Sequence, residues 1–178
     1  MNLSKSLTDE ISSAVAGSKI PASIVAAVCW VESSGDVTAW RPEHAYRYLW
    51  DVRRNAPFRP LTLDERDSET PPADFYSLAG AKAAEWWGQQ ASWGPMQIMG
   101  AVARELGFTG QFPGLCSAFA GVLYGCKHLE NLHKRFFERY GWDGVVAAYN
   151  AGSPRLVDRR FQNQEYVDKI NSALKSMV

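Results

Sequence analysis

The sequence has no surplus of charge of either sign, because its 178 residues include 19 lysines and arginines and 19 aspartates and glutamates. A protein that binds nucleic acid through phosphates needs an excess of basic side chains, so this balance argues against a nucleic-acid partner. No apolar run approaches the roughly 18 residues of a membrane helix. The segment MNLSKSLTDEISSAVAG at the N-terminus lacks the unbroken apolar core of a signal peptide. These absences predict a protein without membrane insertion that binds a neutral polymer or a small molecule.

Cysteine and histidine are scarce, with three residues of each. Cys29 lies in an apolar helical run, and neither Cys116 nor Cys126 forms a C-x-x-C pair, so we expect reduced core thiols. His128 and His133 are five positions apart, which places them on different faces of a helix. The sequence therefore predicts no metal site and no cofactor.

The hydrophobic content of 46% in 178 residues suits one compact domain that spans residues 1–178 and buries a core. Apolar residues recur at spacings of three and four, most clearly over residues 117–140, and little of the chain alternates as a strand would. We therefore expect a mainly α fold with little or no sheet. The expected helices span residues 6–17, 21–33, 43–55, 80–90, 100–106, 117–140, 144–150 and 163–177, with a loop at 64–74.

One acidic residue, Glu32, interrupts an apolar helix face. On a helical wheel of about 100° per residue, Glu32 falls between Val25 and Val28 on the apolar arc. Burial disfavours the charged carboxylate, and the last turn of a helix carries partial negative charge, so both effects raise the pKa of Glu32. A carboxylic acid that keeps its proton near neutral pH can serve as a general acid. The alternative is a helix-ending glutamate that turns into solvent.

Three short motifs follow one another along the chain. Glu32-Ser33 at a helix end precedes Gly-Pro-Met-Gln-Ile at residues 94–98 and Ala-Tyr-Asn-Ala-Gly at residues 148–152. In this order they resemble the motifs of the soluble lytic transglycosylase family, whose second motif usually reads Gly-Leu-Met-Gln, so Pro95 departs from it. The resemblance implies a lysozyme-like fold. It also implies cleavage of the β-1,4 bond between N-acetylmuramic acid and N-acetylglucosamine in peptidoglycan.

The resemblance implies roles for single residues. Glu32 would be the catalytic residue, protonating the leaving oxygen and later acting as base. Tyr149 would orient Glu32, and Ser33 would hydrogen-bond in the cleft near the acid or the sugar. Asn150 would bind the acetamido sugar, and Tyr166, which matches a family tyrosine, would close the pocket from the last helix.

Met96 and Gln97 would line the cleft, with the amide of Gln97 reaching the sugar. Most glycosidases use two carboxylates. This family manages with one, because the acetamido group of the substrate assists and the 6-hydroxyl of muramic acid attacks. The resemblance thus predicts a lytic transglycosylase that forms 1,6-anhydro ends on peptidoglycan strands.

Compared with the family that the motifs resemble, residues 36–92 would be an atypical insertion, and we call this segment the insertion. In an alternative, Asp36 or Glu43 would hold a water and make the enzyme a hydrolysing muramidase. We expect most aromatic rings of the insertion to be core, with one or two facing substrate. The candidates for stacking against sugar faces are Trp40, Tyr46, Trp50, Trp86, Trp87 and Trp93.

A third hypothesis, from another class, is a catalytically inactive wall-binding or virion structural module. The compact size and missing export signal favour a bacteriophage lysis enzyme or a virion-carried wall enzyme. Such a protein would remain in the host cytoplasm until released, or travel with the virion, and would act on the periplasmic cell wall.

Overall fold

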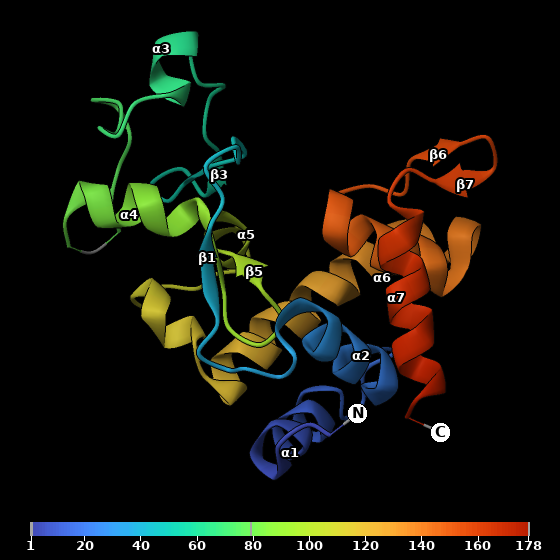
Figure 1. The fold of residues 1–178 in the computed structure, drawn as a ribbon. Coiled ribbons are helices and arrows are strands. Elements are labelled where there is room, and N and C mark those ends of the chain that lie inside the picture. The colour runs from blue at the N-terminus through green and yellow to red at the C-terminus, as the bar shows by residue number, and fades with distance from the viewer. Residues whose placement is uncertain (1, 79, 178) are drawn as a thin grey trace.

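Helices dominate the computed structural model, which describes residues 2–78 and 80–177 (Figure 1). The helices are α1 (Lys5–Ala14), α2 (Ala22–Ser33), α3 (Leu63–Arg66), α4 (Lys82–Gln89), α5 (Gly100–Glu105), α6 (Ala118–Ala151), α7 (Gln164–Lys175) and the 3-10 helix η1 (Phe112–Leu115). The strands are β1 (Trp40–Pro42), β2 (Trp50–Asp51), β3 (Ala56–Pro57), β4 (Ala91–Trp93), β5 (Ile98–Met99), β6 (Leu156–Val157) and β7 (Arg160–Phe161). The expectation of a mainly α fold is confirmed.

Helices α1, α2, α6 and α7 form what we call the helical lobe, and they share one apolar core. In Figure 1, the insertion with α3 and α4 lies on the opposite side of the molecule from α7 and the β6–β7 hairpin. Leu7, Val28, Leu129, Val146 and Ile170 are fully buried in this core. Each such side chain contributes on the order of 2 kcal/mol through removal from water, which is why α7 is held firmly against α2.

The long helix α6 contains one break, at Gly141, where φ is 60° and ψ is −162°. A positive φ is readily adopted by glycine and costs other residues free energy. The sequence predicted separate helices at 117–140 and 144–150, and the break between them is confirmed. Gly152, with φ of 76°, ends the second part.

The prediction of a helix over residues 43–55 is wrong, because this segment is extended and turns through the β2–β3 hairpin. The buried carboxylate of Asp51 accepts hydrogen bonds from the backbone N–H groups of Arg53 at 3.0 Å and Arg54 at 3.4 Å. Asn55 then adopts φ of 49°. Side-chain capping of a turn by aspartate competes with the helix, and here it prevails.

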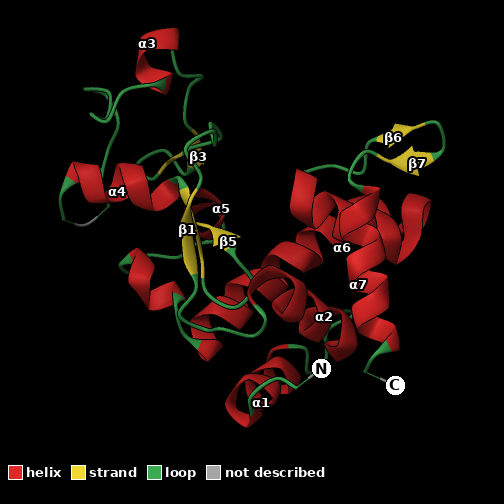
Figure 2. Cartoon of the chain, viewed as in Figure 1, coloured by secondary structure: helices red, strands yellow, loops and turns green. Residues whose placement is uncertain are grey.

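The expectation of little or no sheet agrees with the structure, in which the described residues form three small antiparallel sheets of two- and three-residue strands (Figure 2). The largest has the order β1-β4-β5 and pairs Trp40 with Trp93 and Ser92 with Met99. The loop expected at 64–74 begins with the single turn of α3, which Thr62 caps through the amide of Glu65.

The insertion has a small core of its own around Trp86, whose ring meets that of Phe75 edge-on at 5.2 Å. Trp93 stacks on Trp40 at 5.7 Å between ring centroids. Trp40 and Trp87 remain 59% and 37% exposed. The aromatic rings of the insertion are therefore divided between core and surface.

An ion pair fixes the insertion to the rest of the chain. Arg104 of α5 donates to both oxygens of Glu85 in α4, at 2.8 and 2.9 Å, and both side chains are buried. The remaining guanidinium nitrogen, Nη1, donates to the carbonyls of Phe108 and Gly110. A buried charge pair needs such complete satisfaction, so this contact holds α4 in one orientation against α5.

Candidate active site

Glu32 is the penultimate residue of α2, and the chain reverses directly after it. Ser34 adopts φ of 56° and Gly35 adopts φ of 81°, and the Gly35 amide folds back onto the carbonyl of Cys29 at 3.1 Å. A Cβ at Gly35 would lie 2.6 Å from the side chain of Leu3. The helix therefore ends where the sequence predicts, with Glu32 in its last turn.

Glu32 is half-buried. Its exposure thus lies between the two sequence-based alternatives, a glutamate on the buried apolar face and a glutamate turned into solvent. Tyr166 Oη donates a 2.6 Å hydrogen bond to Glu32 Oε1. Desolvation raises the pKa of Glu32, while the Tyr166 hydrogen bond and the positive charge of Arg41 lower it by less, and the negative charge of Glu43 adds to the rise. The net effect favours the protonated acid.

Tyr166 reaches Glu32 from α7, which packs along α2. Its own pKa is raised, first by burial and then by the charge of Glu32, so the phenol stays a hydrogen-bond donor. Tyr166, which was predicted to close the pocket, is therefore the direct hydrogen-bond partner of Glu32. The side chain that the sequence placed in that role, Tyr149, donates instead to the carbonyl of Met96 at 2.7 Å.

Residues 94–97 form a tight turn seated against α6. A Cβ at Gly94 would lie 2.2 Å from the carbonyl oxygen of Leu115, so only glycine fits there. The Pro95 ring rests on Gly121, where a Cβ would be 2.4 Å from its Cδ, and Met96 rests on Gly125, where a Cβ would be 2.2 Å from its Sδ. Two glycines of α6 thus make room for the turn.

Met96 is fully buried in the helical-lobe core, so the prediction that its side chain lines a cleft is wrong. Its apolar thioether fills the space beside Gly125. Ser33 also has a structural contact, because its hydroxyl lies 2.8 Å from the carbonyl of Pro95 and 3.0 Å from that of Cys29. Ser33 therefore connects the end of α2 to the turn.

Gln97 adopts φ of 48°, and its side-chain amide is almost fully engaged. Nε2 donates to the carbonyls of Ala39 at 3.1 Å and Gly94 at 2.9 Å, and Oε1 accepts from Ser92 Oγ at 2.9 Å. An amide nitrogen has two hydrogens, and both are used here, so the amide of Gln97, which was predicted to reach the sugar, can do so only as an acceptor. Only Oε1 retains a free lone pair.

Gln97, Tyr149 and Asn150 line one open recess of about 510 Å³, which we call the α6 recess. Asn150 is exposed, and its Oδ1 accepts from Asn163 Nδ2 at 2.9 Å. Glu32 is not among the lining side chains, but its charge acts on Tyr149 and, after burial, raises the pKa of that phenol. Tyr149 lines the recess and is also close enough to Glu32 for the charge of the acid to act on it.

The sequence did not indicate His128, which also lines the α6 recess. Its ring lies 5.3 Å from that of Tyr149, and burial lowers its pKa to about 4, so the imidazole is neutral at physiological pH. In the sequence, His128 is five positions from His133, and this spacing argued only against a shared metal site. It gave no sign that His128 lines a recess.

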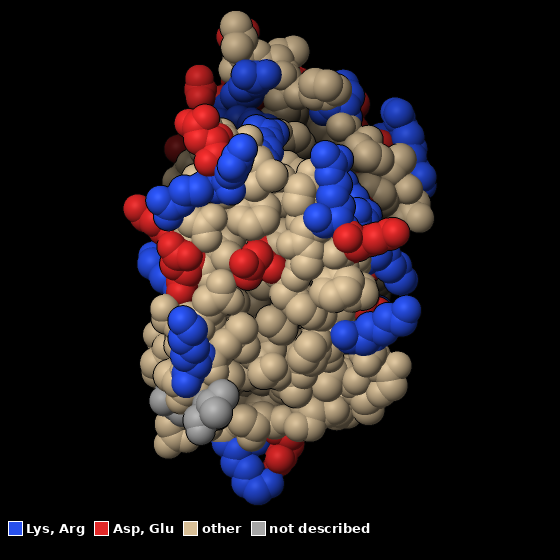
Figure 3. Space-filling view, turned by 90° about the vertical axis from the view of Figure 1, so that its right-hand side faces the viewer, with Lys and Arg blue, Asp and Glu red and all other residues tan. Residues whose placement is uncertain are grey.

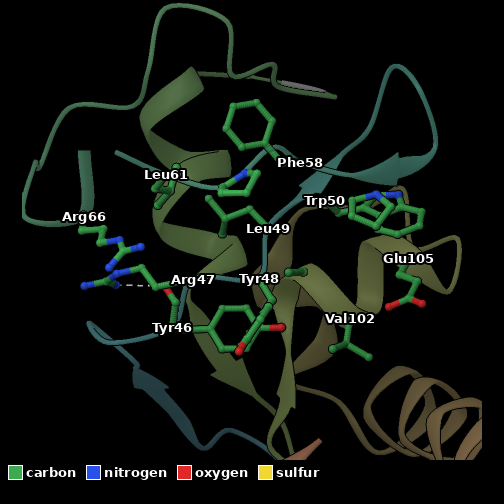
Figure 4. Close-up of a pocket in the computed structure, with 13 residues that line it drawn as sticks. Tyr46, Arg47, Tyr48, Leu49, Trp50, Phe58, Leu61, Arg66, Val102 and Glu105 are labelled. Carbon is green, nitrogen blue, oxygen red and sulfur yellow. Dashed lines mark hydrogen bonds between the residues drawn. The ribbon is translucent and has the colours of Figure 1, made fainter. Parts of the chain in front are cut away.

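A second recess, of about 540 Å³, lies between the insertion and α5 and is shown in Figure 4. We call it the insertion recess. Tyr46, Tyr48 and Val102 line both recesses, so the two meet at these side chains. Tyr48 is 79% exposed, which is unusual for so large a ring.

The face of the molecule on the α7 side carries both signs of charge around a broad uncharged area (Figure 3). Within the described residues, no helix is long and apolar enough to cross a membrane. No family model, curated protein or solved structure matches this chain. Function must therefore be inferred from the geometry of the site.

Proposed function

We propose that the protein cleaves peptidoglycan glycan strands, on a lysozyme-like fold, with Glu32 as the catalytic acid and base. The observation that supports this most is the half-buried Glu32 carboxyl at the end of α2, with its pKa raised by desolvation and one oxygen held by Tyr166 at 2.6 Å. A protonated carboxyl fixed by a neutral donor can deliver its proton to a glycosidic oxygen.

Three polar side chains near the acid have roles in the proposed reaction. Tyr166 orients the carboxyl and stabilises the carboxylate that remains after proton transfer, because a hydrogen bond to the charged form favours it. Asn150 offers its exposed amide at the α6 recess for the acetamido group of a sugar. Tyr149 lines this recess and keeps the turn at Met96 in place through its hydrogen bond to the Met96 carbonyl.

The product that we propose is a 1,6-anhydro end, as formed by a lytic transglycosylase. The alternative muramidase needs a second carboxylate as base. Asp36 is exposed, and hydrogen bonds from Thr38 lower its pKa, which makes it a weaker base. Glu43 is paired with Arg41, with 2.6 Å between Nε and Oε1. Both candidates are therefore already engaged.

Mass spectrometry of digested cell wall tests the proposal. Glycan ends one water lighter than reducing ends support the transglycosylase, and reducing ends indicate the muramidase. The Glu32→Gln variant is the control. If it clears walls as fast as the wild type, Glu32 is not the acid. If the wild type releases no glycan but sediments with wall fragments, the protein is a binding module.

A further inference from the structure

The insertion recess carries two arginines that form no ion pair with any carboxylate of the described residues. Arg47 and Arg66 both line it, and in the view of Figure 4 their head groups project toward the same side. Among the described residues that line the recess, Glu105 is the one acid, and Figure 4 shows it on the other side. The recess thus has an excess of positive charge at one end.

Both guanidinium groups have free donors. Arg47 Nη1 donates to the carbonyls of His44 and Tyr46, and its Nε and Nη2 hydrogens have no acceptor among the residues that the structure describes. Arg66 is exposed at the end of α3, and its side chain has no hydrogen bond or ion pair within residues 2–78 and 80–177. Arg47 is positioned by the backbone, and Arg66 is free to close onto a ligand.

Glu65 of α3 and Asp74 do not compensate these charges, because both pair with another arginine, Arg59. Arg59 donates to both oxygens of Glu65, at 2.7 and 2.8 Å, and to both oxygens of Asp74, at 2.7 Å. These two carboxylates are therefore committed to Arg59, and neither forms an ion pair with Arg66. Two forked, planar donors beside apolar surface suit a carboxylate, which guanidinium binds through two parallel hydrogen bonds.

The remaining lining of the recess is aromatic and aliphatic, and includes Leu49, Trp50, Phe58 and Leu61. Pockets of several hundred Å³ with apolar walls and a few placed polar groups are typical of sites for small ligands. Because the insertion recess meets the α6 recess at Tyr46 and Tyr48, a chain that leaves Asn150 can continue past these rings.

From these contacts we infer that the insertion recess is an additional binding site for peptidoglycan, in which Arg47 and Arg66 hold a carboxylate of the strand. This inference rests on the proposed function for the identity of the ligand. The carboxylate comes either from the lactyl group of N-acetylmuramic acid or from a stem peptide, and both present the same chemistry to the arginines.

Calorimetric binding to the full chain tests this, using Glu32→Gln so that the ligand is not cut. The ligands are peptide-free glycan strands, peptide-bearing strands and N-acetylglucosamine oligomers of equal length, which lack a carboxylate. Adding Arg47→Gln and Arg66→Gln should weaken binding of at least one carboxylated strand about tenfold and that of the oligomers less than twofold. Loss with peptide-free strands identifies the lactyl group, and loss only with peptide-bearing strands identifies the stem.

The matched control adds Arg139→Gln and Arg159→Gln, which remove the same charge from exposed positions outside both recesses. It should leave every affinity within twofold. Equal loss for carboxylated and neutral ligands, or no loss for either, overturns the inference. Should the double variant misfold, Arg66→Gln alone keeps the test, because that side chain has no bond within the described protein. Wall digestion by the wild type is scored separately, so failure of this site and failure of the proposed function are distinguishable.

Discussion

Tyr166 Oη donates a 2.6 Å hydrogen bond to Oε1 of Glu32, across 134 positions of sequence. It joins α7 to the last turn of α2, where desolvation raises the pKa of the carboxyl. The hydrogen bond lowers that pKa, so burial and bonding act in opposite directions on one proton. The proposed acid is therefore tuned by a residue from the far end of the chain.

Replacing Tyr166 with Phe should shift the alkaline limb of the pH–activity profile to higher pH. The hydrogen bond favours the carboxylate, so its removal raises the pKa of Glu32 further and keeps the acid protonated longer. Activity at the optimum should fall about tenfold because the carboxyl loses its orientation. Wall-clearing rates across pH measure both effects. Tyr140→Phe is the control, because the Tyr140 ring meets Phe161 edge-on away from Glu32's hydrogen bond. If the alkaline limb of the Tyr166→Phe profile stays at the wild-type pH, the prediction is wrong.

Glu32→Gln should stabilise the protein more at pH 8 than at pH 4. The folded state holds the Glu32 proton more tightly than the unfolded chain, because the folded pKa is raised. That contribution to the unfolding free energy is complete below the unfolded pKa of about 4.3 and is lost as pH rises through the folded value. Urea unfolding at several pH values measures the difference. Exposed Glu138→Gln is the comparison, and a pH-independent effect at Glu32 refutes this linkage.

Gly125→Ala should destabilise the protein by about 1–3 kcal/mol. The added Cβ would lie 2.2 Å from Met96 Sδ, and Met96 is fully buried, so the turn at residues 94–97 must move. Thermal unfolding and wall clearing should both report the change. In Gly114→Ala the Cβ would meet only Phe108 Cζ, at 3.7 Å, and stability should stay near that of the wild type. Equal effects at both glycines would speak against the packing described.

His128→Phe should reduce the loss of stability at acid pH. Burial lowers the pKa of His128 from 6.5 to about 4, so the unfolded chain binds this proton first as pH falls. The contribution of neutral His128 to the unfolding free energy is complete above pH 6.5. It is lost as pH falls toward 4, by up to about 3 kcal/mol. The phenyl ring preserves the contact with Tyr149. Unfolding at pH 7 and pH 4 checks this, with His133→Phe alongside; unchanged acid sensitivity of the first variant would be evidence against it.

Local patterns in the sequence predict much of the helical lobe. The helix ends at Ser33 and Gly152 and the break at Gly141 all follow from apolar spacing and from glycines that adopt positive φ. The insertion was predicted poorly, since residues 43–55 form a hairpin capped by Asp51 and not a helix. The Trp50 N–H donates to Gln89 Oε1, and Gln89 Nε2 donates to the Trp50 carbonyl. These two hydrogen bonds also stabilise that extended path, and no local pattern reveals them.

The sequence by itself determined that Glu32 ends an apolar helix and that glycine-rich turns follow it, because these depend on spacing within a few residues. The tertiary structure decided which tyrosine holds the acid, that Met96 is core, and that the amide hydrogens of Gln97 are used internally. These outcomes depend on how α7, α6 and the insertion pack against α2. Such packing arises from the summed burial of residues far apart in the chain, which a local pattern does not contain.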